Sequence, residues 1–211
     1  MSDAVRPSPV TIRGELSDPP GRGLWLVKWL LIIPHIVVLV FLAAAAVFCT
    51  VAAFFAILFT GRYPRGLFDF TVGVLRWGWR VEFYSYGALA TDRYPPFSLK
   101  SMDDYPADLH IAYPEALSRW KPLVKWLFAF PHYLILAALA GCGGGSDGGA
   151  YFIGLLGALV IIVAVLLLFT ENYHRDLYRL IMGIHRWKYR VCAYVGLLTD
   201  EYPHFRLMDD R

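Results

Sequence analysis

The sequence has few charged residues: they make up 18% of its 211 residues, against about 25% in soluble globular domains. Its three cysteines, Cys49, Cys142 and Cys192, are widely spaced and odd in number, which argues against a disulfide framework and a zinc knuckle. No Ser-His-Asp arrangement, HExxH, CxxC or phosphate-binding glycine loop is present. We therefore expect a protein that is not an enzyme and that holds no cofactor.

The first residues lack an apolar segment followed by a small-residue cleavage site, so we expect no signal peptide. Apolar residues make up 57% of the chain, and its mean hydropathy is +0.47. They gather in three blocks, 24–60, 123–140 and 151–170, each long enough to cross a hydrocarbon core of about 30 Å. The basic residues flank these blocks, so we expect anionic phospholipid and no nucleic acid as a partner.

The chain contains two copies of one unit. LVKWLLIIPH from Leu26 returns as LVKWLFAFPH from Leu123, an offset of 97 residues, and FTGRYPRGLFDF from Phe59 returns as FTENYHRDLYRL from Phe169, an offset of 110. The extra residues of the second copy include GCGGGSDGG, which interrupts a helix because each Gly costs about 1 kcal/mol relative to Ala. We assign the first repeat to 1–108 and the second to 109–211.

The glycine-rich tract predicts a hairpin of two membrane helices in the second repeat. As one helix, the apolar run 24–60 would be about 55 Å long, so we expect it to turn near 42–46 as well. The predicted spans are 24–41, 44–60, 123–140 and 151–170. All Lys and Arg residues then lie on one face, which the positive-inside rule makes cytoplasmic.

These patterns predict an all-α protein of the inner membrane with four transmembrane helices and both termini in the cytoplasm. Two hairpins give the copies a parallel orientation about a pseudo-twofold along the membrane normal. Alternating apolar residues at 10–12 and 109–113, with the short PFSL and HFRL pieces, predict a small cytoplasmic β-sheet.

An arginine-tryptophan helix follows each predicted hairpin, at 65–84 and 174–194. At 3.6 residues per turn its arginines fall within about 80° of the helix circumference, and its tryptophan points the other way. We expect both helices to be amphipathic and interfacial, with the arginines at phosphate depth and the tryptophans below them. The candidate lipid- or partner-binding residues are Arg65, Arg76, Trp77, Arg80, Arg175, Arg179, Arg186, Trp187 and Arg190.

Two interpretations of these helices stay open. They either brace the hairpins, or form a composite site for an anionic head group or an acidic protein segment. Gly73 and Gly183 lie within the stripes and allow another backbone to approach closely.

His35 and His132 are candidate metal or haem ligands, since the duplication can bring two imidazoles together. No further His lies in the predicted spans, so we favour an interfacial role beside Lys28 and Lys125. Asp92 and Asp200, in TDRYP and TDEYP, are read as turn residues.

The motifs WLxxxPH, FTxxYPRGLFDF, GVxRWxxR and TDxYPPF resemble the bacterial membrane-protein family called domain of unknown function 4389. The resemblance covers almost the whole chain, once per repeat, and implies a membrane architecture but no activity. The second copy departs from the pattern with His174, Asp176 and Arg179 in place of Pro64, Gly66 and Asp69.

We expect a non-enzymatic membrane scaffold or accessory subunit that binds anionic lipid, a membrane protein partner or a second copy of itself. A transporter or channel component is the alternative, disfavoured because the predicted spans carry no charge except Lys28 and Lys125 at their ends. A lipid-modifying enzyme is third, because no nucleophile, carboxylate pair or metal site is found.

Overall fold

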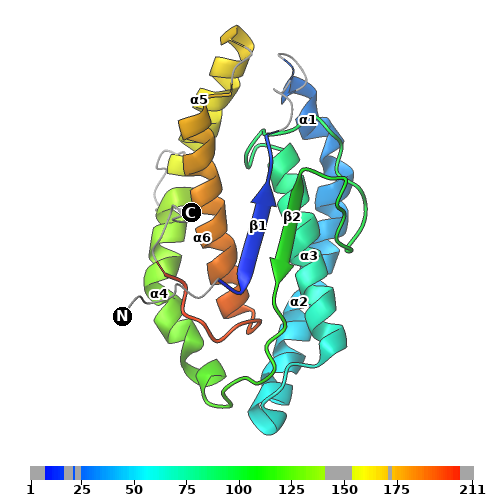
Figure 1. Ribbon diagram of the computed structural model, residues 1–211, viewed down its shortest axis with the longest axis vertical. Helices are drawn as coiled ribbons and strands as arrows, with labels where there is room; N and C mark the ends of the chain where they lie inside the picture. Colours follow the sequence, from blue (N-terminus) through cyan, green and yellow to red (C-terminus); the bar gives the residue numbers. More distant parts are fainter. Residues whose placement is uncertain (1–7, 17–20, 22–24, 141–153, 171–172, 205–211) are drawn as a thin grey trace, which may run out of the picture.

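The computed structural model describes residues 8–16, 21, 25–140, 154–170 and 173–204. Within them the chain is mostly helical, as predicted, with one small sheet (Figure 1). In chain order the elements are β1 (Val10–Gly14), α1 (Trp25–Leu31), α2 (Ile33–Thr60), α3 (Arg65–Tyr84), β2 (Ala107–Ile111), α4 (Lys121–Ala140), α5 (Leu155–Thr170) and α6 (Arg175–Val195).

The apolar run of the first repeat forms α1 and, after a break at Ile32, the continuous helix α2, so the predicted turn at 42–46 is wrong. Residues 41–49, FLAAAAVFC, contain four consecutive alanines and no Gly or Pro that would stop a helix. Pro34 lies in the first turn, where its missing N–H leaves no bond unmade. The helix ends only at Gly61, which adopts the left-handed conformation (φ 72°) typical of helix ends.

In the second repeat, the predicted helices 123–140 and 151–170 are confirmed as α4 and α5 with small shifts of their ends. The glycine-rich segment predicted to join them lies outside the described residues. Among the described helices, α2 and residues 121–139 of α4 are long and apolar enough to cross a membrane, whereas the apolar part of α5, 155–167, is shorter. The structure therefore supports two candidate spans and not the four predicted.

The two repeats run in opposite directions along the molecule. In Figure 1, α2 descends and α3 returns upward, whereas α4 begins at the lower end and α6 descends from the upper end. A hydrogen bond of 2.9 Å from Leu117 N to Gly61 O ties the segment before α4 to the α2–α3 corner. The long helices α2 and α4 are therefore antiparallel, not parallel as two equivalent hairpins would place them.

The sheet consists of β1 and β2, paired antiparallel with Ile12 opposite Leu109. These two residues are equivalent at the repeat offset of 97, so a local twofold axis passes between them, perpendicular to the strands. Two equivalent hydrogen bonds of 2.9 Å, Glu15 N to Pro106 O and Ala112 N to Pro9 O, confirm this symmetry. The predicted sheet is confirmed for these strands, but the PFSL segment is not a strand and most of HFRL lies outside the described residues.

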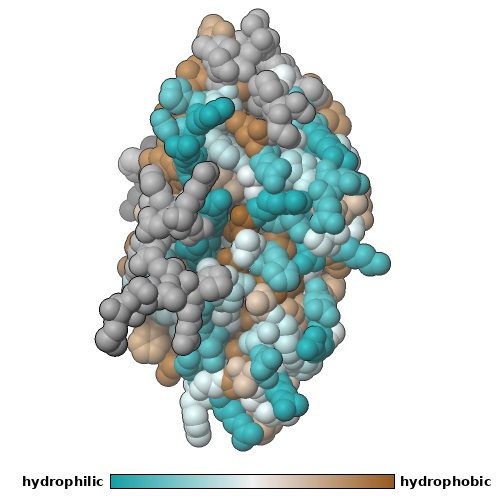
Figure 2. All heavy atoms as spheres, in the orientation of Figure 1, coloured by the Kyte–Doolittle hydropathy of each residue, from teal (hydrophilic) through white to brown (hydrophobic). Residues whose placement is uncertain are grey.

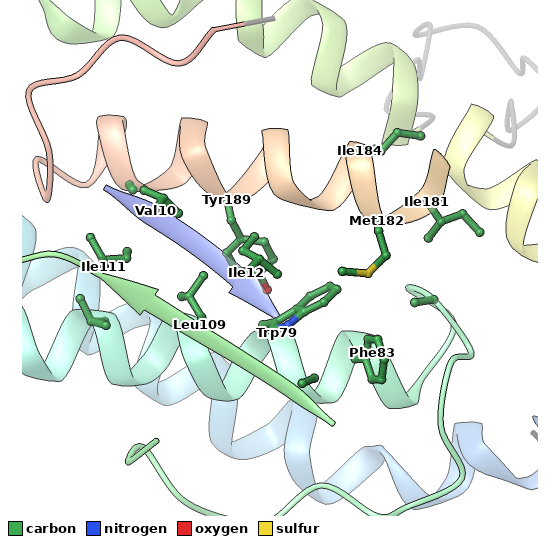
Figure 3. Close-up of a cluster of buried hydrophobic side chains, with 14 of the residues drawn as sticks. Val10, Ile12, Trp79, Phe83, Leu109, Ile111, Ile181, Met182, Ile184 and Tyr189 are labelled. Carbon is green, nitrogen blue, oxygen red and sulfur yellow. The ribbon is translucent and has the colours of Figure 1, made fainter. Parts of the chain in front are cut away.

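Each strand packs on the helix of the other repeat: β1 contacts α6, and β2 contacts α3. Figure 3 shows the resulting core, in which Ile12 and Leu109 from the strands meet Trp79 and Phe83 from α3 and Met182 from α6. Burial of these apolar side chains at the sheet joins the two repeats into one body.

Candidate functional site

The predicted arginine-tryptophan helices exist as α3 and α6, but α3 is enclosed by protein. Arg80 has no exposed surface; it donates hydrogen bonds to Ser98 O (3.1 Å) and Lys100 O (2.6 Å) and pairs with Asp108 (3.1 Å). Arg76 donates to Leu109 O (2.8 Å) and Leu99 O (2.9 Å). These two arginines therefore face β2 and the inter-repeat linker, which is the segment 85–106 between α3 and β2.

The linker needs such donors because it has no regular secondary structure to pair its carbonyl groups. Arg13 of β1 adds bonds to Tyr105 O (3.1 Å) and to the carbonyls of residues 102 and 103, and Arg93 binds Asp104 O. Gly73 lies so close to Leu99 that an added Cβ would stand 2.8 Å from the Leu99 Cβ atom. The close approach expected at Gly73 is therefore made by this chain's own linker.

The other predicted arginines lie nearer the surface. Arg65 is exposed and lies 4.2 Å from the Tyr113 ring centroid. Arg175 and Arg179 are exposed, and Arg179 lies 3.6 Å from Asp176. Arg186 and Arg190 are partly exposed. The structure thus separates the predicted stripe into an inward-facing pair on α3 and exposed cations at the helix starts.

Both tryptophans predicted to face lipid are buried in protein, at 4% exposure for Trp77 and 2% for Trp187. Trp77 Nε1 donates a hydrogen bond of 3.2 Å to His35 Nδ1, and Phe97 stacks on the same imidazole. His132 lies against Trp187, and its Nε2 donates a hydrogen bond of 2.9 Å to Pro203 O. The interfacial placement of these tryptophans is therefore wrong, because α2 and α4 supply the apolar partner instead of lipid.

The two histidines are held in separate aromatic surroundings, each within its own repeat, and are not brought together. Among the described residues, no group of three or more His, Cys, Asp or Glu side chains is arranged to hold a metal.

Sequence reasoning missed two equivalent lysine clusters. In the first, Lys28 Nζ donates to Thr91 O (2.7 Å), pairs with Asp92 (2.8 Å) and lies over the Tyr84 ring at 4.8 Å. In the second, Lys125 Nζ donates to Thr199 O (2.7 Å), pairs with Asp200 (2.8 Å) and lies over the Tyr194 ring at 5.2 Å. Both lysines are fully or almost fully buried.

Each lysine cluster attaches the N-terminal part of an apolar helical segment, α1 or α4, to the TDxYP segment that follows the arginine helix in the chain. The ammonium group is neutralised by a carboxylate, a carbonyl and an aromatic face, which is the arrangement a buried charge requires. The sequence did contain a signal: Lys28 and Asp92 of the first repeat recur in the second as Lys125 and Asp200. We interpreted Lys28 and Lys125 as interfacial and the aspartates as turn residues, and so did not pair them.

A third charged cluster joins α3 to α6 and occurs once. Glu82 lies 2.5 Å from Lys188 Nζ, 3.2 Å from the Tyr189 hydroxyl and 3.4 Å from His185 Nδ1. Burial by itself raises the pKa of Glu82, but Lys188 and then His185 outweigh it and lower the pKa from 4.5 to about 2. Glu82 is therefore a carboxylate at neutral pH and holds the two repeats in register.

A cationic corner lies where α2, α3 and the segment before α4 meet. It comprises Arg62, Arg65, Arg119 and Lys121, all exposed, beside Trp120, which is 76% exposed. Arg119 Nε would stand 3.5 Å from a Cβ on Gly61, which places this side chain against the corner. Among the described residues, no carboxylate lies within 4.0 Å of Arg62, Arg65 or Arg119, so the corner can attract an anion.

A family model described as Domain of unknown function (DUF4389) matches residues 22–98 and 152–206, together more than half of the chain. The chain belongs to this family. The two matched segments fall in the two repeats, so the tandem duplication is shown as well. No curated protein and no solved structure matches the chain.

Proposed function

We propose that this DUF4389 protein is a non-enzymatic membrane scaffold or accessory subunit that holds anionic phospholipid at its cationic corner. The supporting observation is that Arg62, Arg65 and Arg119 lie at the ends of two apolar helices, α2 and α4. The rest of the protein leaves much of the surface of these helices uncovered. Of the 28 residues of α2, only His35, Ala53 and Ile57 are buried. A helix that is apolar on all sides and uncovered by protein fits a hydrocarbon environment.

Because Arg76 and Arg80 contact the linker and β2, we propose that the lipid site does not lie at the middle of the predicted stripe. The exposed members of that stripe, Arg65, Arg175 and Arg179, remain candidates for contact with head groups. We keep the inner membrane and the cytoplasmic side for both termini, because anionic lipid on that side attracts exposed cations. A membrane protein partner or a second copy of the chain remains part of the proposal for the uncovered apolar helices.

The test is the lipid retained on purification in mild detergent, measured by mass spectrometry. Replacing Arg62, Arg65 and Arg119 by Gln removes three cations worth about 1 kcal/mol each near an anionic surface, so we expect retained phosphatidylglycerol or cardiolipin to fall by one to two orders of magnitude at low salt.

The matched control is Arg175→Gln with Arg179→Gln at the equivalent α5–α6 corner, where Asp176 already offsets one charge. This variant should lose less lipid. Unchanged lipid in the triple variant would contradict the corner as the lipid site.

A further inference from the structure

We propose that the molecule lies flat in one leaflet of the membrane, with α2, α4 and α5 immersed along their length and the β1–β2 face toward water, instead of crossing the bilayer. The inference rests on the proposed membrane function and concerns how the bilayer contacts the protein. The exposed apolar surface of α2, α4 and α5 contacts the acyl chains of a single leaflet.

The length of α2 argues against an upright orientation. At 1.5 Å per residue its 28 residues measure about 42 Å, and fitting this into a core of about 30 Å requires a tilt of about 45°. Observed tilts of membrane helices range up to about 40°. The helix has no acidic or basic residue in its first or last turn to mark a crossing of the interface.

The position of the sheet argues the same way. The strands run lengthwise beside α3 and α6, at the middle of the molecule (Figure 1). A two-stranded sheet leaves two open edges, and the cross-strand pair Thr11 and His110 is exposed. An upright orientation would put these edges and this pair at mid-depth in hydrocarbon, where unpaired backbone groups are not tolerated.

The linker adds charge to the same face. Arg93, Lys100, Asp103 and Asp104 are all exposed, and Figure 2 shows many hydrophilic residues on this face, with apolar patches between them. Charged groups of this kind face water or line a cavity when they occur in membrane proteins. The linker face is therefore the water-facing side of the flat molecule.

The apolar helices carry their most exposed residues away from the protein. The large apolar residues of α2 that are exposed by 51–76% fall within about 120° of the helix circumference; they are Val37, Val40, Phe41, Val47, Phe48, Val51, Phe55 and Phe59. The buried residues of α2 lie on the opposite side of the helix. On α4, Leu127 is 75% exposed and lies opposite the buried Lys125 and His132.

The local twofold axis explains how antiparallel repeats both meet one leaflet. Because the axis between Ile12 and Leu109 is perpendicular to the strands, it can coincide with the membrane normal when the long helices lie in the membrane plane. Both repeats then present the same faces to lipid and water. With upright helices the same axis would lie in the membrane plane, and the lysine clusters would lie on opposite sides of the bilayer.

The first test places single cysteines at Arg62→Cys and Arg93→Cys, at the two ends of α2, in a full chain lacking Cys49, Cys142 and Cys192. An impermeant maleimide is applied to spheroplasts and to inverted vesicles. We expect both positions to react from the cytoplasmic side only. Reaction of the two positions from opposite sides would overturn the flat orientation, as would reaction of Ala44→Cys from outside, which indicates a hairpin.

The second test measures depth in phosphatidylglycerol-containing liposomes with spin labels at Phe41→Cys, Phe48→Cys and Phe55→Cys, which share one face and are spaced about 10 Å apart along the helix. A flat helix gives three equal depths within about 3 Å, whereas a crossing helix places the labels at clearly different depths. Variants must keep the parental thermal midpoint to be compared. Loss of all three variants and the parent from carbonate-washed membranes would instead contradict the membrane function itself.

Discussion

The two repeats build the same lysine cluster but surround it with different charges. The Lys–carbonyl distance is 2.7 Å in both copies and the Lys–carboxylate distance is 2.8 Å in both. The tyrosine contacts also correspond: Tyr94 donates to Leu31 O at 3.3 Å, and Tyr202 donates to Phe128 O at 3.4 Å. The attachment of each long apolar helix is therefore common to both halves.

The differences lie around the sheet and at the corners. Asp108, the partner of Arg80, is replaced at the equivalent position of β1 by Thr11, and Glu82 is replaced in α6 by Cys192. Glu82 pairs with Lys188, and the equivalents of these two residues, Cys192 and Gly78, carry no charge, so this ion pair occurs on one side of the axis only. The comparison teaches that the duplicated parts hold the long apolar helices and pair through the sheet, whereas the unequal parts add charged contacts between the halves.

The largest expected difference between the repeats concerns their central arginines. Arg80→Ala should destabilise the protein by about 3–5 kcal/mol, because it removes the buried donor of two linker carbonyls and the closer of the two arginines that pair with Asp108. The equivalent Arg190→Ala should cost about 1–2 kcal/mol, since Arg190 is partly exposed. Chemical unfolding in mild detergent measures the free energy of unfolding of both variants. Equal losses of stability would contradict the expected difference between the repeats.

The lysine clusters should respond equally. Lys28→Ala and Lys125→Ala should each cost about 3 kcal/mol, because each variant removes the buried cation that pairs with the carboxylate at 2.8 Å. Lys121 is the control: it lies 3.8 Å from the same Asp200 but is 51% exposed, so Lys121→Ala should cost less than about 1 kcal/mol. A large difference between Lys28 and Lys125 in unfolding measurements would show that one cluster dominates.

A smaller, pH-dependent difference should come from Glu82. Because its folded pKa is about 2 and its ordinary value 4.5, its stabilisation is complete above about pH 4.5 and is lost as the pH falls toward 2. After allowance for its partial exposure, Glu82→Gln should lower stability by about 1–2 kcal/mol at pH 7.

The measurement is thermal unfolding between pH 7 and pH 3, in which the Gln variant should lack this part of the acid dependence. Glu115→Gln, at an exposed position, should follow the parent. If the Gln variant and the parent lose stability in parallel on acidification, Glu82 does not carry the effect.

The duplication, the arginine helices and the strand at Val10 were predictable because each has a local pattern: a repeated motif, a helical period or an alternation. The continuity of α2 was not, since the expected turn rested on an assumed upright helix and on analogy with the second copy. Nothing between Phe41 and Cys49 stops a helix. The burial of Trp77 was also unpredictable, because a helix pattern gives the direction of a side chain but not what lies there.

The exchange of strands between repeats has a consequence for how such a chain arose. Because β1 packs on α6 and β2 on α3, neither repeat contains the strand that covers its own arginine helix. A protein with a single copy could complete this sheet only by pairing its strand with that of an identical molecule, about the residue equivalent to Ile12. The chain is thus arranged as a covalently linked pair of like halves, and each half can carry its own charges, as Asp108 and Thr11 do at equivalent positions.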